Sequence, residues 1–123
     1  GHVLYNRGLL NAMVVVESIR TAQSKFGKKP LTGEQVRWGI ENLNLDQARI
    51  DKLGFTGIMR PLKVSCFDHE GDRNARIHQW DGKQWKFVSE WIEGDNSVLR
   101  PMVEEAAAKY AKEKNITPTD CKA

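Results

Sequence analysis

Residues 31–54 read LTGEQVRWGIENLNLDQARIDKLG, and this stretch predicts two consecutive helices. Thr32 is followed three residues later by Gln35, which is the capping-box pattern at the start of a helix. Asp46 is a suitable N-cap for a second, shorter helix, and Gly54 is a typical residue for its end. The stretch therefore predicts a helix–helix unit that closes in a turn.

The segment before this unit has the pattern of a longer helix. Between residues 4 and 26, apolar side chains recur at spacings of three and four residues, which is typical of one helical face. Gly27 follows as a natural C-terminal stop. The residues on the main face are Leu9, Ala12, Met13, Val16 and Ile19.

Strand patterns and one more helix follow the unit. Residues 62–67 alternate loosely, and residues 75–80 and 85–91 predict a hairpin joined across Asp81-Gly82. Ser97 is the expected N-cap of a last helix that ends near Asn115. The predicted class is α/β: helices packed on a short sheet with a β-hairpin, plus a C-terminal helix.

Length and composition indicate one globular domain, and the sequence pattern predicts no membrane-spanning segment. The 123 residues are 40% hydrophobic and 28% charged, with a net charge of +3. The mean hydropathy is −0.56, and no long uncharged apolar run is present. The chain enters an apolar stretch at Val3, close to its first residue, without a signal-peptide pattern. We expect a piece of a longer protein.

Acidic residues and a histidine gather at Asp68, His69, Glu70 and Asp72. Their spacing does not fit a calcium loop, and a zinc site would need a further ligand for which His78 is a distant candidate. A polar turn is the favoured interpretation, and a metal hydrolase is the alternative. The sequence contains no G-x-S-x-G, P-loop or G-x-G-x-x-G pattern, so neither enzymatic activity nor a cofactor is expected.

The predicted hairpin carries tryptophans on a basic chain. Trp80 and Trp85 flank its turn, where they can close the hairpin by cross-strand contact or stack on bases. A small basic nucleic-acid-binding module is therefore the alternative function. Cys66 and Cys121 form no CxxC pair; in an oxidising compartment they can bridge, and in a reducing one they are ordinary thiols.

Taken in order, several segments resemble the C-terminal part of a periplasmic solute-binding protein of the branched-chain amino acid ABC transporter family. The resemblance covers residues 3–92, while the helix and tail of residues 97–123 have no counterpart in the family's better-known members. The segments that carry it are Tyr5-Asn6-Arg7-Gly8, Glu17 to Ala22, Leu31 to Arg37, Phe55-Thr56-Gly57 with Pro61-Leu62, Phe67 to Asp72, and Gln79 to Gly82.

The resemblance implies a single C-terminal fragment, residues 1–123, of a type I periplasmic binding protein fold. Residues 1–73 then belong to the first lobe, residues 74–92 are crossover hairpin strands, and residues 97–123 are a C-terminal helix and tail. Such proteins hold a small solute between two lobes and present it to an ABC permease. The implied function is therefore a periplasmic receptor for branched-chain amino acids, amides or aromatic acids, with an incomplete cleft.

The same resemblance implies particular residues and partners. It places ligand contacts at Leu4 and Tyr5, at the start of the first helix. A periplasmic origin favours a disulfide between Cys66 and Cys121. Because a fragment exposes apolar area and strand edges, a homo-oligomer is expected.

Overall fold

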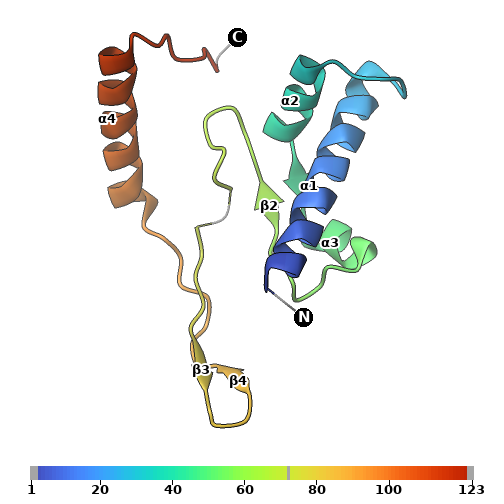
Figure 1. Ribbon diagram of the computed structural model, residues 1–123, viewed down its shortest axis with the longest axis vertical. Coiled ribbons are helices and arrows are strands. Elements are labelled where there is room, and N and C mark those ends of the chain that lie inside the picture. Colours follow the sequence, from blue (N-terminus) through green and yellow to red (C-terminus); the bar gives the residue numbers. More distant parts are fainter. Residues whose placement is uncertain (1–2, 72, 122–123) are drawn as a thin grey trace. The chain divides into compact units, whose positions relative to one another are not determined.

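The structure, a computed structural model, describes residues 3–71 and 73–121 and divides the chain into unit 1, residues 1–72, and unit 2, residues 73–123 (Figure 1). Both units combine helices with short strands or a hairpin, so the expected α/β class is confirmed in this general sense. Unit 1 holds α1 (Val3–Phe26), α2 (Gly33–Glu41), β1 (Asn44–Leu45), α3 (Gln47–Leu53) and β2 (Leu62–Lys63). Unit 2 holds β3 (His78–Trp80), β4 (Trp85–Phe87) and α4 (Asn96–Lys114).

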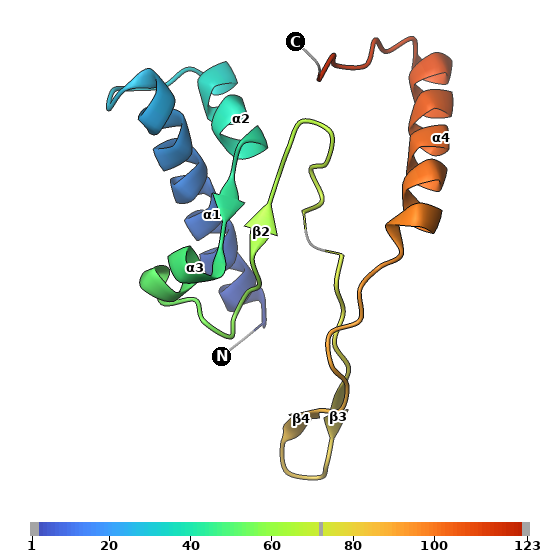
Figure 2. The ribbon, with the colours of Figure 1, turned by 180° about the vertical axis from the view of Figure 1, so that it is seen from behind.

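Small residues set the close packing of α1 against α2, which lie side by side in both views (Figures 1 and 2). Ser18 and Ala22 of α1 are fully buried, and Gly39 of α2 packs directly on them. A Cβ atom at Gly39 would overlap the carbonyl oxygen of Ser18 and lie 2.9 Å from the Cβ of Ala22. The backbones approach this closely because position 39 has no side chain.

The core of unit 1 lies where α1 and α3 meet a two-stranded antiparallel sheet. Leu45 of β1 pairs with Leu62 of β2, and Figure 2 shows the two strands as neighbouring arrows. Ile50 of α3 is completely buried in this core. The buried cluster consists of Met13, Leu43, Leu45, Ile50 and Val64.

The predicted helix ends of unit 1 are confirmed. The Thr32 hydroxyl accepts a hydrogen bond from the Gln35 backbone N–H at 3.3 Å, and the Gln35 side chain accepts one from the Thr32 N–H at 3.0 Å. The Asp46 carboxylate caps α3 by accepting from the backbone N–H of Arg49 at 2.8 Å. Gly54 ends α3 with a φ of 78°, a conformation that favours glycine.

Replacing Asp46 with alanine is expected to lower the free energy of unfolding by about 1 kcal/mol, because an N–H at the start of α3 loses its acceptor. Urea unfolding of unit 1 can be followed by Trp38 fluorescence in a background that lacks the three other tryptophans, Trp80, Trp85 and Trp91. Asp46→Asn is the matched control, because its side-chain oxygen still caps the helix. Equal stability of the two variants would contradict the capping role.

Unit 2 contains a hairpin shorter than the sequence pattern suggests. β3 pairs with β4 in the register Trp80↔Trp85, and an isolated bridge joins Ala75 to Ile92 further along. The two tryptophan rings lie 5.7 Å apart, so they form the expected cross-strand contact. The Asp81 carboxylate closes the turn by accepting from the backbone N–H groups of residues 83 and 84, each at 2.9 Å.

Three sequence-based expectations differ from the structure. The strand expected over residues 62–67 is limited to residues 62–63, because Ser65 and Asp68 exchange backbone hydrogen bonds and turn the chain. The last helix is capped by Asp95 instead of Ser97, since the Asp95 carboxylate accepts from the Ser97 N–H at 2.9 Å. β1 was not expected, because its pairing partner lies far along the chain.

Candidate functional site

A hollow of about 480 Å³ opens on unit 1, between its helices and its sheet. Its walls are mostly apolar, and His69 and Glu70 give it a polar side. Of the apolar residues, Val15 is half exposed and Val64 is buried in the core. A hollow of this size and character can receive an apolar group and orient it by a few polar contacts. The lining residues are Asn11, Val14, Val15, Ile40, Leu62, Val64, His69 and Glu70.

The polar side of this hollow is linked to α2 through Glu41. The His69 Nε2 atom lies 3.2 Å from Glu41 Oε1, and the Arg37 Nε donates to the same oxygen at 2.8 Å. The hydrogen bond from Arg37 is the main cause that lowers the pKa of Glu41, and His69 acts in the same direction. Glu41 is therefore a carboxylate at neutral pH that anchors both neighbours.

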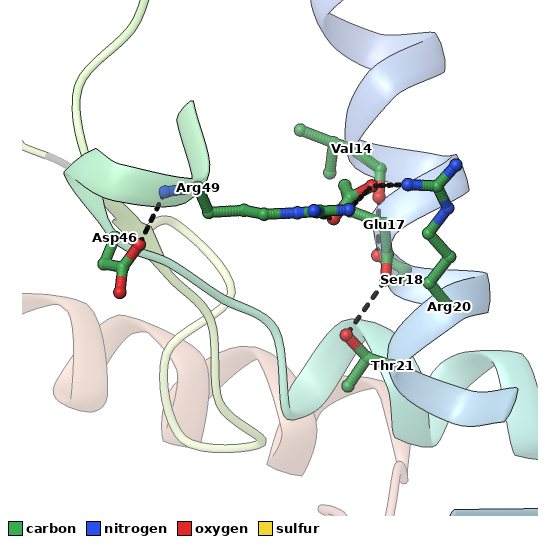
Figure 3. A network of polar contacts seen from close by, with 7 residues as sticks. All are labelled: Val14, Glu17, Ser18, Arg20, Thr21, Asp46 and Arg49. Atoms are coloured by element: carbon green, nitrogen blue, oxygen red, sulfur yellow. Dashed lines mark hydrogen bonds and ion pairs between the residues drawn. The ribbon is translucent and has the colours of Figure 1, made fainter. Parts of the chain in front are cut away.

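A second polar group, centred on Glu17, joins α1 to α3 (Figure 3). The guanidinium of Arg49 donates from Nε to Glu17 Oε2 at 2.7 Å and from a terminal nitrogen to Oε1 at 2.9 Å. Arg20 donates to Oε1 at 3.0 Å. The Arg49 hydrogen bonds are the main cause that holds the pKa of Glu17 below its usual range, against the opposing effect of burial.

This Glu17 network was not predicted from the sequence. Glu17 is 5% exposed, although acidic side chains are seldom buried without a partner. Its partner Arg49 is 32 residues away in sequence. One sequence signal pointed to the burial of Glu17: it follows Met13 by four residues and so lies on the same face of α1, which is buried. The network links two elements, and its bidentate geometry gives it a structural role.

The residues predicted to contact a solute do not line the hollow. Leu4 and Tyr5 lie in the first turns of α1, where their side chains are 63% and 67% exposed. A ligand-binding role for Leu4 and Tyr5 stays a prediction.

The acidic stretch around His69 forms a turn. The Asp68 carboxylate accepts from the backbone N–H groups of Glu70 at 3.0 Å and of Gly71 at 3.4 Å, which is the geometry expected for an aspartate in a turn. Asp72 lies outside the described residues. Within residues 3–71 and 73–121, no three His, Cys, Asp or Glu side chains converge on a point that could hold a metal ion.

Two cationic side chains of the hairpin, those of Arg76 and Lys86, make contacts within unit 2. The Arg76 guanidinium carbon lies 3.7 Å from the centre of the Phe87 ring, and its Nε donates to the Ser89 carbonyl at 2.9 Å. The Lys86 ammonium pairs with the Asp81 carboxylate at 2.7 Å. These contacts hold the hairpin together and neutralise part of its positive charge, which counts against a nucleic-acid surface.

The two cysteines belong to different units, Cys66 to unit 1 and Cys121 to unit 2. The part of the chain that the structure describes contains no free cysteine. The pairing of Cys66 with Cys121 stays a prediction.

The chain is similar to a solved crystal structure described as an ABC transporter permease from the Pseudomonas fluorescens group. The two sequences are 56% identical, and the structures superpose with a TM-score of 0.86. The match covers 95% of this chain but 28% of that chain, so this chain spans little more than a quarter of the protein it matches. Comparison with protein-family models finds no match, and comparison with curated proteins finds none.

This similarity corrects the functional assignment made from the sequence. The sequence pattern assigns the chain to the periplasmic solute-binding proteins. However, the protein that matches 95% of this chain is described as a permease. The assignment as a solute receptor is therefore wrong, and the nucleic-acid alternative is not supported either. In the part of the chain that the structure describes, none of the helices combines the length and apolar character that a membrane crossing requires.

Several of the segments that carried the mistaken resemblance form caps and turns in the structure. Thr32 and Gln35 close a capping box, and Asp81 closes a hairpin turn. Gly57 and Gly71 have φ angles of 75° and 77°, which favour glycine. Such residues recur at the turns of unrelated proteins, so their order along the chain is a poor guide to function.

Proposed function

We propose that this chain is part of the permease component of an ABC transporter and contributes to it by protein contact, without catalysis. The observation that carries the proposal is the 56% identity over 95% of the chain to the Pseudomonas protein described as an ABC transporter permease. At this level of identity the buried contacts of the two proteins are expected to be largely shared. The role of the matched region in that protein is therefore the best guide to its role here.

A contact role agrees with the way unit 1 uses its polar groups. Glu17, which is buried, and Glu41, which is partly buried, are both held by arginines in ion pairs that fix the fold. The hollow beside Glu41 is mostly apolar and has exposed apolar residues such as Val15 in its walls, as expected where an apolar group of another protein segment packs. The walls of this hollow are the first place to look for contacts with the rest of the transporter.

A segment exchange tests the proposal. The matched 28% of the Pseudomonas protein is replaced by this chain, and the chimera is expressed together with the transporter's ATPase subunit. We expect the chimera to co-purify with the ATPase as well as the parent does. A chimera in which Ile40 is replaced by lysine changes one exposed wall of the hollow and should assemble less well, while Glu34→Lys on the same helix should not. A soluble, folded chimera that fails to assemble would overturn the proposal.

The periplasmic location is also a proposal, and the thiols of Cys66 and Cys121 provide its test. If the mature chain resides in an oxidising compartment, the two cysteines are expected to be bridged. Chain isolated from cells should then resist alkylation under denaturing conditions until a reductant is added. Intact mass should show the loss of two thiol hydrogens, and Cys66→Ser should make Cys121 alkylable. Full alkylation of both cysteines without reductant would contradict the bridge.

A further inference from the structure

The hairpin of unit 2 presents large aromatic side chains to solvent near its tip. Trp80 and Trp85 lie opposite each other beside the turn, and they are 51% and 66% exposed. In the next non-terminal pair examined along the same face, Phe87 is 54% exposed and the centre of its ring lies 4.1 Å from that of His78. These ring contacts place all four side chains on one face of the hairpin. This face is therefore aromatic and open to solvent.

The opposite face of the hairpin is also apolar. Side chains alternate between the two faces of a strand, so Ile77 and Val88 lie on the face away from Trp80 and Phe87. The Val88 N–H donates to the Ile77 carbonyl at 3.0 Å, which continues the strand register by one pair. Ile77 and Val88 are each 53% exposed. A protein that docks on one face would leave the other in water, whereas a lipid bilayer contacts both faces of an inserted hairpin.

The charges of the hairpin indicate which kind of bilayer it fits. Residues 76–87 contain three basic side chains and a single acidic one, Asp81, whose carboxylate pairs with the Lys86 ammonium. The Lys83 ammonium, in the turn between the two tryptophans, has no ion-pair partner among the described residues. The tip of the hairpin is therefore positively charged. It complements a surface that carries negative headgroups above an apolar layer.

We propose that the tip of the β3–β4 hairpin binds the interface of a membrane that contains anionic lipids. Tryptophan suits this layer because its ring is apolar and its indole N–H can donate to water or to a headgroup. In the described structure each strand of the hairpin has a single strand neighbour, so one edge of each strand lacks a strand partner. Backbone groups on such edges cannot be buried in hydrocarbon. The hairpin is therefore expected to stop in the headgroup layer, with Lys83 beside the lipid phosphates.

Co-sedimentation with lipid vesicles tests the proposal with the full chain. We expect stronger binding to vesicles of phosphatidylglycerol and phosphatidylcholine in equal parts than to phosphatidylcholine alone, and added salt should weaken it. Tryptophan emission should shift to shorter wavelength on binding. When Trp80 and Trp85 are both replaced by alanine, binding should fall at least about tenfold. The emission of the remaining Trp38 and Trp91 should then show no shift.

Two further substitutions separate insertion of the hairpin from general attraction between charges. Lys83→Glu should weaken binding to the anionic vesicles by about tenfold. Lys52→Glu, on an exposed position of α3, changes the net charge equally and should have a much smaller effect. Val88→Gln preserves the net charge and the tryptophan pair, and it should weaken binding because both faces contact lipid. The near-ultraviolet circular dichroism of the tryptophan pair checks that the hairpin stays folded in this variant.

Three results would overturn the proposal. Failure to bind the anionic vesicles, or equal binding to both kinds of vesicle, shows that anionic lipid is not the partner. An effect of Lys52→Glu as large as that of Lys83→Glu assigns the attraction to the net charge of the chain. Unchanged binding by Val88→Gln shows that only one face is covered, as in docking to a protein. None of these measurements involves the ABC transporter, so this proposal and the proposed function can fail separately.

Discussion

Replacing Gly39 with alanine is expected to destabilise unit 1 by about 2 kcal/mol, although alanine is the better helix former by about 1 kcal/mol. The added Cβ would overlap the backbone oxygen of Ser18 and press on Ala22, and neither atom can move without shifting α1. The helices must therefore separate, which opens the contact between them. The measurement is urea unfolding followed by Trp38 fluorescence.

A matched control for this variant is Gly8→Ala in α1. Gly8 is exposed within a helix, and a Cβ added there meets no atom within 4 Å. This substitution should leave stability unchanged or raise it by up to about 1 kcal/mol. If Gly39→Ala behaved in the same way, close backbone packing would not determine how α1 meets α2.

Replacing Glu17 with glutamine is expected to cost about 2 kcal/mol at neutral pH, because Arg49 and Arg20 lose the carboxylate that they share. The estimate lies below the range for fully buried pairs, since Arg49 is 30% exposed and remains partly hydrated. Glu34→Gln, on the exposed start of α2, removes a charge without breaking an ion pair and should have little effect.

The cost of Glu17→Gln should depend on pH in a defined direction. The pKa of Glu17 is lowered in the folded chain, so its stabilising effect is fully present above the unfolded-state pKa of about 4.3. It is lost as the pH falls through the lower, folded-state pKa. The difference between the two proteins should therefore be constant above about pH 6 and shrink below about pH 4. A difference that does not change with pH would contradict the ion pair.

The sequence predicts those parts of the fold whose causes are local. The capping box at Thr32, the N-cap at Asp46 and the stop at Gly54 depend on residues within one helical turn, and all three are confirmed. The hairpin at Asp81-Gly82 is confirmed for the same reason. Each of these features can be read from neighbouring residues because the hydrogen bonds involved close within them.

The features that the sequence does not predict depend on distant pairs. β1 forms because Leu45 meets Leu62, and Glu17 is buried because Arg49 reaches it from another element. Function was missed for a related reason. Several of the segments that resembled a solute receptor consist of turn and cap residues, which form local hydrogen bonds and do not indicate what the protein binds. The assignment as a solute receptor was corrected only by the similarity of 95% of this chain to a protein described as a permease.

Because no side chain of α4 is buried, we expect its amide hydrogens to exchange early. The hydrogen bonds of α4 are supported by its own backbone and caps, so local opening of this helix should require much less free energy than opening of α1. In deuterated solvent its amides should exchange well before those around Ser18.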